Sequence, residues 1–136
     1  MEYILHADDD ATDRSDLERL LNVVMPSAKL TGCSNGLELM QCLGNLRDDE
    51  LPCLIFLDIR MPIWDGIRTL NALKSDGRYS FIPVLMWSIT DTMNEINLCL
   101  RSGAMEFITK PTTDAEWKEM KIKMDKLVKD VQQVYC

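Results

Sequence analysis

Acidic side chains and one lysine directly follow three of the hydrophobic runs in this sequence. Asp8 and Asp9 come after the first run, Asp58 after the third, and Lys110 after the last. Short apolar runs of this kind indicate buried parallel strands. Ligands bind at the carboxyl ends of the strands in an open parallel sheet. We therefore expect three carboxylates and one ammonium group to converge at that edge, in an arrangement that suggests a metal ion and a phosphoryl group.

The predicted cluster has the ligand chemistry of a magnesium site. Carboxylates at positions 8, 9 and 58 would repel one another at close range, and a divalent cation relieves that repulsion. Mg²⁺ prefers oxygen ligands and commonly binds one or two carboxylates together with a phosphate. Lys110 would bring a positive charge to a phosphoryl oxygen, and Ser88, just past the fourth run, would donate a hydrogen bond to it. These residues predict phosphoryl transfer to a carboxylate, in which positioning and charge neutralisation provide most of the catalysis.

Strands and helices alternate five times along the chain. Hydrophobic runs predict strands at about 2–7, 29–33, 53–57, 82–87 and 106–108. Helical spacing and capping residues predict helices at about 11–25, 36–44, 67–75, 91–102 and 114–136. The acidic segment 48–50 is interpreted as a solvated turn. This alternation predicts an α/β fold with a parallel sheet and helices on both of its faces.

Size and charge exclude several classes of protein. The 136 residues fit one domain, and the hydrophobic content of 46% is enough for a substantial core. A net charge of -7 argues against direct binding of nucleic acid, which needs a basic surface. No apolar run has the length of a membrane span, and the first residues lack the basic region of a signal peptide. We therefore expect a cytoplasmic protein.

The cysteines and the single histidine are interpreted as core residues. The five cysteines are irregularly spaced and form no CxxC motif. This pattern favours reduced, mostly buried thiols over a disulfide framework or a zinc site. His6 lies inside the first predicted strand, where a hydrogen-bonded core residue is expected rather than a ligand.

Taken in order, the motifs resemble the receiver domain of two-component response regulators. The residues that carry the resemblance are Asp8-Asp9, the stretch from Leu57 to Pro62 with Asp65-Gly66, the stretch from Pro83 to Ser88, and Lys110-Pro111. The resemblance covers all five strand–helix units. It implies a single receiver domain over residues 1–136, without an effector domain. The implied fold is flavodoxin-like and doubly wound, with strand order 2-1-3-4-5 and five helices in an α/β/α sandwich.

The resemblance also implies a role for each site residue. Asp58 would accept a phosphoryl group from the phosphohistidine of a histidine kinase or a histidine phosphotransfer protein. Asp58, Asp9 and the backbone carbonyl of Arg60 would bind Mg²⁺, or Mn²⁺ in its place, and Asp8 would bind it through water. Ser88 would contact the phosphoryl group after transfer. Lys110 would pair with Asp58 before transfer and with the phosphoryl oxygens afterwards, and its bond to Pro111 is expected to be cis.

Four positions depart from the usual family pattern or control its switch. Ser88 stands where threonine is commoner. Ile89 follows it where the family usually has a small residue, and Arg60 places a long cation at the mouth of the site, so both are expected to affect access to the phosphorylated aspartate. Phe107 occupies the position of the switch aromatic, which follows Ser88 inward. The surface that responds would be the predicted helix 91–102, strand 106–108 and last helix.

Partners are expected on that same surface. Partner docking or a homodimer would use it, and segment 128–135 is expected to project beyond the sheet because the last helix is longer than the strands. An alternative function is a pseudo-receiver, a protein-binding module that no longer depends on phosphorylation, and Ile89 keeps that alternative open.

Enzyme classes with related folds fit less well. An aspartate-nucleophile phosphatase would carry a second aspartate at the position of Arg60. In a flavodoxin-like electron carrier, the acidic residues 8–10 would repel the flavin phosphate. We therefore predict a switch that catalyses only its own phosphorylation and dephosphorylation.

Overall fold

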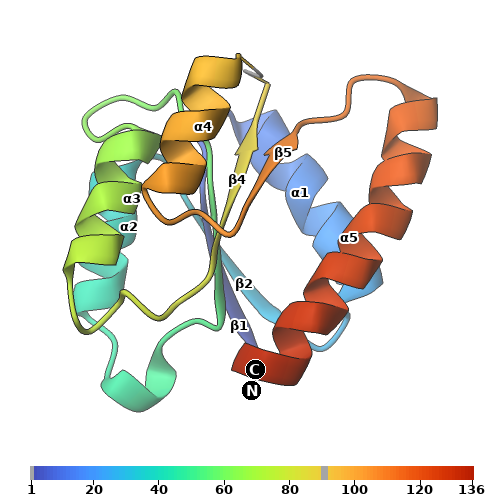
Figure 1. Cartoon of the computed structure of the whole chain (residues 1–136). Helices are drawn as coiled ribbons and strands as arrows, with labels where there is room; N and C mark the ends of the chain where they lie inside the picture. The colour runs from blue at the N-terminus through green and yellow to red at the C-terminus, as the bar shows by residue number, and fades with distance from the viewer. Residues whose placement is uncertain (1, 90–91) are drawn as a thin grey trace.

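The fold is built around one five-stranded sheet in which all neighbouring strands are parallel. A computed structural model of the chain describes residues 2–89 and 92–136. The strand order is β2-β1-β3-β4-β5, as the flavodoxin-like prediction required (Figure 1). The strands are β1 (Tyr3–Ala7), β2 (Lys29–Cys33), β3 (Leu54–Leu57), β4 (Val84–Ser88) and β5 (Glu106–Thr109). Strand β4 begins two residues later than predicted, because Pro83 has no N–H to donate to the ladder.

Five α-helices connect and follow the strands, and a polar side chain caps each one at its N-terminus. They are α1 (Ala11–Val24), α2 (Gly36–Gly44), α3 (Gly66–Ser75), α4 (Met93–Arg101) and α5 (Asp114–Tyr135). The capping side chains belong to Asp10, Asn35, Asp65, Thr92 and Thr113. Thr113 and Glu116 form a capping box at the start of α5. The predicted start of the fourth helix at Asp91 lies outside the described residues.

The sheet separates two apolar cores. Helices α2, α3 and α4 cover one face and α1 and α5 cover the other, so the chain forms three layers (Figure 1). Alternate residues of β3 point to the two sides: Ile55 and Leu57 join the core under α2 and α3, whereas Leu54 and Phe56 join the core under α1 and α5. Burial of both faces of β3 explains its unbroken apolar sequence.

The last turns of α5 pack on the sheet instead of projecting from it. Val128 and Val131 are 0% and 2% exposed, and Gln132 Nε2 donates a hydrogen bond to Glu2 Oε2 over 2.5 Å. The expectation that segment 128–135 projects is therefore wrong. Strand length alone underestimates the surface available to a helix, because residues that precede the strands extend the core. Val134 and Tyr135, in the last turn, are exposed.

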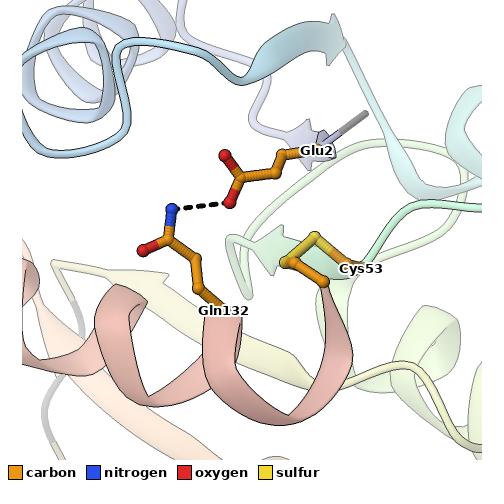
Figure 2. Close-up of a disulfide and its surroundings, with 4 residues drawn as sticks. Glu2, Cys53 and Gln132 are labelled. Carbon is orange, nitrogen blue, oxygen red and sulfur yellow. Dashed lines mark hydrogen bonds between the residues drawn. A yellow bond between two sulfur atoms is a disulfide. The ribbon is translucent and has the colours of Figure 1, made fainter.

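One pair of cysteines is joined, which contradicts the prediction of reduced thiols throughout. Cys53 and Cys136 form a disulfide, with their Cα atoms 5.4 Å apart (Figure 2). The pairing arises because α5 runs antiparallel to the strands and returns to their amino ends, where Cys53 precedes β3. Cys33, Cys42 and Cys99 are free, as predicted.

Two other local predictions can be compared with the structure. His6 is buried, and its Nε2 lies 3.2 Å from Glu18 Oε1, which confirms a hydrogen-bonded core histidine. The segment Asp48–Glu50 is an exposed 3₁₀ turn, which confirms a solvated turn, and Arg78 Nε donates to Asp48 Oδ1 over 2.6 Å. Within the described residues, no helix is both long and apolar enough to cross a membrane.

Candidate functional site

The predicted site residues meet at the carboxyl end of the sheet because the strand ladder continues one residue beyond each strand. The backbone N–H of Asp58 donates to Ala7 O over 3.0 Å, and that of Lys110 donates to Ser88 O over 2.9 Å. The N–H of Asp8 bonds in the same way to the end of β2. The neighbouring strand therefore fixes the backbone position of each of these residues.

Lys110 lies at the centre of the cluster. Its Nζ is 2.6 Å from Asp8 Oδ2 and 2.8 Å from Asp58 Oδ2. The three side chains are between 5% and 8% exposed, so these ion pairs are shielded from water. The sequence predicted this pairing of Lys110 with Asp58, and the structure places the two groups in direct contact.

Asp13 is a third carboxylate on the same ammonium group, and the sequence analysis did not single it out. Its Oδ2 lies 2.8 Å from Lys110 Nζ, and its side chain is 35% exposed. Asp13 occupies the first turn of α1, and its backbone N–H donates to the cap residue Asp10. An acidic residue in the first turn of a helix is ordinary, since it interacts well with the helix dipole. Its position in the sequence therefore gave no sign that it faces the site.

Burial and charge act in opposite directions on the ionisable groups. Burial is the largest influence on Asp8 and raises its pKa to about 6, although hydrogen bonds from Lys110 and from the N–H of Asp10 lower it. For Lys110, burial lowers the pKa, but hydrogen bonds to Asp13, Asp58 and Asp8 together outweigh it and leave the pKa raised. Lys110 therefore stays charged at neutral pH, whereas Asp8 is poised to gain a proton in mild acid.

Asp8, Asp9 and Asp58 offer oxygen atoms that all lie within 4.8 Å of one another. Asp8 and Asp58 are buried and Asp9 is exposed, so the group opens to solvent on one side. The buried Oδ1 of Asp58 has no hydrogen-bond partner in the described part of the chain. A buried carboxylate oxygen without a donor, beside two further carboxylates, fits a hard divalent cation.

Gly66 allows α3 to approach Asp58 closely. A Cβ atom at this position would lie 2.0 Å from the backbone oxygen of Asp58, and the N–H of Gly66 donates to Ile59 O over 2.8 Å. Asp65 caps the same helix by accepting from Arg68 N, and Asp10 caps α1. Asp10 and Asp65 therefore serve as helix caps.

Ser88 lies on β4, the strand beside β3, and Phe107 lies on β5, one strand further from Asp58. Ser88 ends β4, is fully buried and pairs in register with Thr109. Phe107 pairs with Met86 and is partly buried against the core under α2, α3 and α4. Phe107 therefore lies between core and solvent, one strand from the buried hydroxyl of Ser88.

Arg60 and Ile89 follow β3 and β4 at the carboxyl end of the sheet, and both side chains are exposed. Arg60 is 69% exposed, and its Nη2 pairs with Glu95 Oε1 at 2.8 Å. This pair links the loop after β3 to α4, and Glu95 was not identified from the sequence, because its partner is 35 residues away. A cleft beside the cluster is lined by Asp9, Ile59, Arg60, Met61, Pro62, Asp65, Ile67 and Glu95. Ile89 is 67% exposed at the end of β4.

The peptide bond between Lys110 and Pro111 is trans, so the expectation of a cis bond is wrong. Strand pairing at Lys110 N already directs the lysine side chain toward the carboxylates.

Comparisons with known proteins agree with this geometry. The family model described as "Response regulator receiver domain" matches residues 4–121. The Arabidopsis thaliana proteins "Two-component response regulator ARR7" and "Two-component response regulator ARR16" are each 33% identical over 88% of this chain. The match covers 60% of the first and 77% of the second, so the chain spans less than two thirds of the length of the former.

A solved structure shows the same fold. The Mn²⁺-bound form of response regulator Rcp1 superposes with a TM-score of 0.76 at 21% identity, covering 92% of each chain.

Proposed function

Since the chain belongs to the response regulator receiver domain family, we propose that it is a phosphoacceptor switch in a two-component phosphorelay. A histidine kinase or a histidine phosphotransfer protein would supply the phosphoryl group, and the protein would act only on its own aspartate. The observation that carries this proposal is the buried contact of Lys110 with Asp58, whose second carboxylate oxygen has no donor.

Asp58 is the proposed nucleophile. Its Oδ2 is engaged by Lys110, which leaves Oδ1 to form the new O–P bond while the P–N bond of phosphohistidine breaks. Lys110 then neutralises charge on the phosphoryl oxygens, to which its ammonium group lies close. The chain contributes mainly positioning, because the nucleophile, the ammonium group and the neighbouring carboxylates are fixed before the donor arrives.

Asp58, Asp9 and the backbone carbonyl of Arg60 are the proposed ligands of Mg²⁺, with Mn²⁺ as an alternative ion and Asp8 holding a bound water. The ion would neutralise the acidic cluster and the developing charge on the phosphoryl oxygens. Of these groups, Asp9 is the exposed one, which places it on the open side of the cluster. The Mn²⁺-bound form of Rcp1 supports a site for such ions in this fold.

Ser88 and Phe107 are the proposed switch. Ser88 would turn its hydroxyl toward the phosphoryl group, and Phe107 would move into the space that Ser88 leaves. Phosphate shifts the population only as far as it contacts one state better than the other. Arg60 and Ile89, at the mouth, would set how readily water reaches the phosphoryl group.

The proposed docking surface comprises α4, β5 and α5. Several apolar side chains of α4 and the turn after it are exposed: Met93, Leu98, Leu100 and Met105. A protein partner, or a second copy of this chain, would cover them in the phosphorylated state. Light scattering at high protein concentration tests the second copy, since a monomer with and without phosphorylation would exclude the dimer.

The proposal is tested by intact mass measurement after incubation with acetyl phosphate or phosphoramidate. We expect one phosphoryl adduct that requires Mg²⁺ and is absent from Asp58→Asn. Asp49→Asn, an exposed aspartate near the opposite end of β3, serves as the matched control and should form the adduct normally.

The absence of an adduct with both donors, in protein that melts cooperatively, would favour the pseudo-receiver alternative. Ile89→Ala would then show whether the side chain at the mouth blocks the donor.

A further inference from the structure

A pair of cysteines lies at the end of the sheet opposite the acidic cluster. Cys53 immediately precedes β3, and Cys136 follows the last turn of α5; their Cα atoms are 5.4 Å apart although 83 positions separate them in the sequence. This spacing is within the range that a disulfide spans without movement of the backbone. Figure 2 shows the bond joining the end of α5 to the start of the strand.

The pair differs from Cys33 and Cys99 in its exposure, and from Cys42, which is partly buried like Cys53, in being joined to another cysteine. Cys136 is exposed and Cys53 is partly exposed, so small oxidants and reductants can reach the bond. Cys33 and Cys99 are buried in the core, and burial raises their thiol pKa to about 12 and about 11 respectively. Thiols of that kind react poorly, because the thiolate is the reactive form. Cys53 and Cys136 are therefore accessible and, unlike Cys42, already lie at disulfide distance from each other.

The disulfide fixes the last turn of α5, which makes few other contacts with the rest of the fold. The buried residues of α5 end at Val131, and Val134 is 74% exposed. Within the described residues, the side-chain hydrogen bond that ties α5 beyond Val131 to the start of β1 is the one between Gln132 and Glu2 (Figure 2). A covalent link at Cys136 adds a second anchor just past the last turn.

We propose that Cys53 and Cys136 form a reversible oxidation site that fastens the last turn of α5 to the amino end of β3. The proposal does not depend on phosphorylation of Asp58. Disulfides in reducing compartments are usually transient and regulatory, so reversibility is the property that gives this pair a function.

The oxidant class is a small disulfide such as oxidised glutathione. The thiolate of the more exposed Cys136 attacks one sulfur of the oxidant, forms a mixed disulfide and expels one thiol. The thiolate of Cys53 then attacks the sulfur of Cys136 and expels the second thiol. The protein loses two protons and two electrons, and the small disulfide is reduced to two thiols.

The first test counts free thiols in the intact protein. The chain is equilibrated in oxidised or reduced glutathione, unfolded, alkylated and weighed, and its peptides are then mapped. We expect three alkylated cysteines and a linked Cys53–Cys136 peptide after oxidation, and five alkylated cysteines after reduction. Five alkylated cysteines in both buffers, or glutathione attached to Cys136 without the link, would overturn the proposal.

The second test measures what the bond does to the fold. Closing a loop of this length should raise the melting temperature of the oxidised protein by roughly 10 °C over the reduced form. Amide exchange in residues 132–135 should slow at the same time. Cys136→Ser should abolish both differences, and Cys42→Ser, which removes a free, partly buried thiol, should keep them. A redox-dependent shift that survives in Cys136→Ser would assign the effect to another site.

Discussion

The two ends of β3 are organised by different forces. Asp58, just beyond its carboxyl end, belongs to a cluster of one lysine and several carboxylates that are mostly buried. Cys53, just before its amino end, belongs to a region held by the packing of α5 and by a disulfide. The strand between them is fully buried and links the two regions.

This difference separates a region whose stability depends on pH and cations from a region whose stability does not. Buried charges depend on pH and on cations, because the balance between desolvation and attraction changes when either one is altered. Apolar packing depends on neither. The carboxyl end is therefore expected to change stability with the state of its charges, while the amino end stays constant unless its disulfide is reduced.

The largest expected effect comes from removing the central cation. Lys110→Met leaves Asp8 and Asp58 buried without their positive partner, so the free energy of unfolding at pH 7 should fall by about 4 kcal/mol. Urea denaturation without divalent cations measures it. The matched control is Lys129→Met, because Lys129 pairs with Asp125 on the surface of α5. This substitution should change the free energy of unfolding very little. Equal losses in the two variants would remove the distinction between buried and exposed pairs.

The second effect has the opposite sign and tests the pKa of Asp8. Because the folded pKa of about 6 exceeds the ordinary value of 3.8, Asp8 supports folding while protonated, and this support is lost as pH rises through about 6. Asp8→Asn should therefore stabilise the cation-free protein at pH 7 by roughly 3 kcal/mol, with the gain disappearing below about pH 4. Added Mg²⁺ should reduce the difference in unfolding free energy between Asp8→Asn and the unsubstituted protein.

Urea titrations at several pH values measure this gain. Asp10→Asn is the control, since asparagine caps a helix as well as aspartate does and Asp10 is exposed. A gain that persists unchanged at pH 3.5 would show that charge at Asp8 is not its cause.

The third effect tests whether the amino end is insensitive to charge. Val131→Ala removes two methyl groups from a side chain that is 2% exposed, and should cost about 2 kcal/mol of unfolding free energy. The cost should be the same at pH 5 and pH 7 and with or without Mg²⁺, as measured by urea denaturation. Val134→Ala, one turn later and 74% exposed, should change little. A cost that varied with Mg²⁺ would show that the two ends of β3 are coupled.

The sequence predicted the carboxyl end well because its information is local. Asp8, Asp58 and Lys110 each come directly after an apolar run, and parallel pairing brings those positions together whatever the exact strand bounds. The layers and strand order followed from the same alternation and from the family resemblance. Asp13 escaped notice because acidic residues in a first helical turn usually serve the helix itself, and Glu95 because its partner Arg60 is 35 residues away.

The amino end was predicted poorly because its contacts are not local. Pairing of Cys53 with Cys136 depends on where α5 ends relative to a strand 83 residues earlier, and neither cysteine has a spacing that indicates a partner. The same difficulty led to the wrong expectation that the end of α5 projects. The periodicity of apolar residues predicts the length of a helix. Its position along the sheet depends instead on contacts such as that of Gln132 with Glu2.

The smallest expected effect concerns Asp13, the partly exposed member of the charged cluster. Lys110 must serve the phosphoryl group while Asp13 also binds it, so Asp13→Asn should free the ammonium group and speed adduct formation from acetyl phosphate by up to about fivefold. Its stability should change little, because Asp8 and Asp58 still hold the lysine. Asp16→Asn, which removes a partner of Arg19 on the same helix, is the control for lost charge. A tenfold fall in rate would instead mean that Asp13 holds Lys110 in its productive position, and that the charged end of the sheet extends into α1.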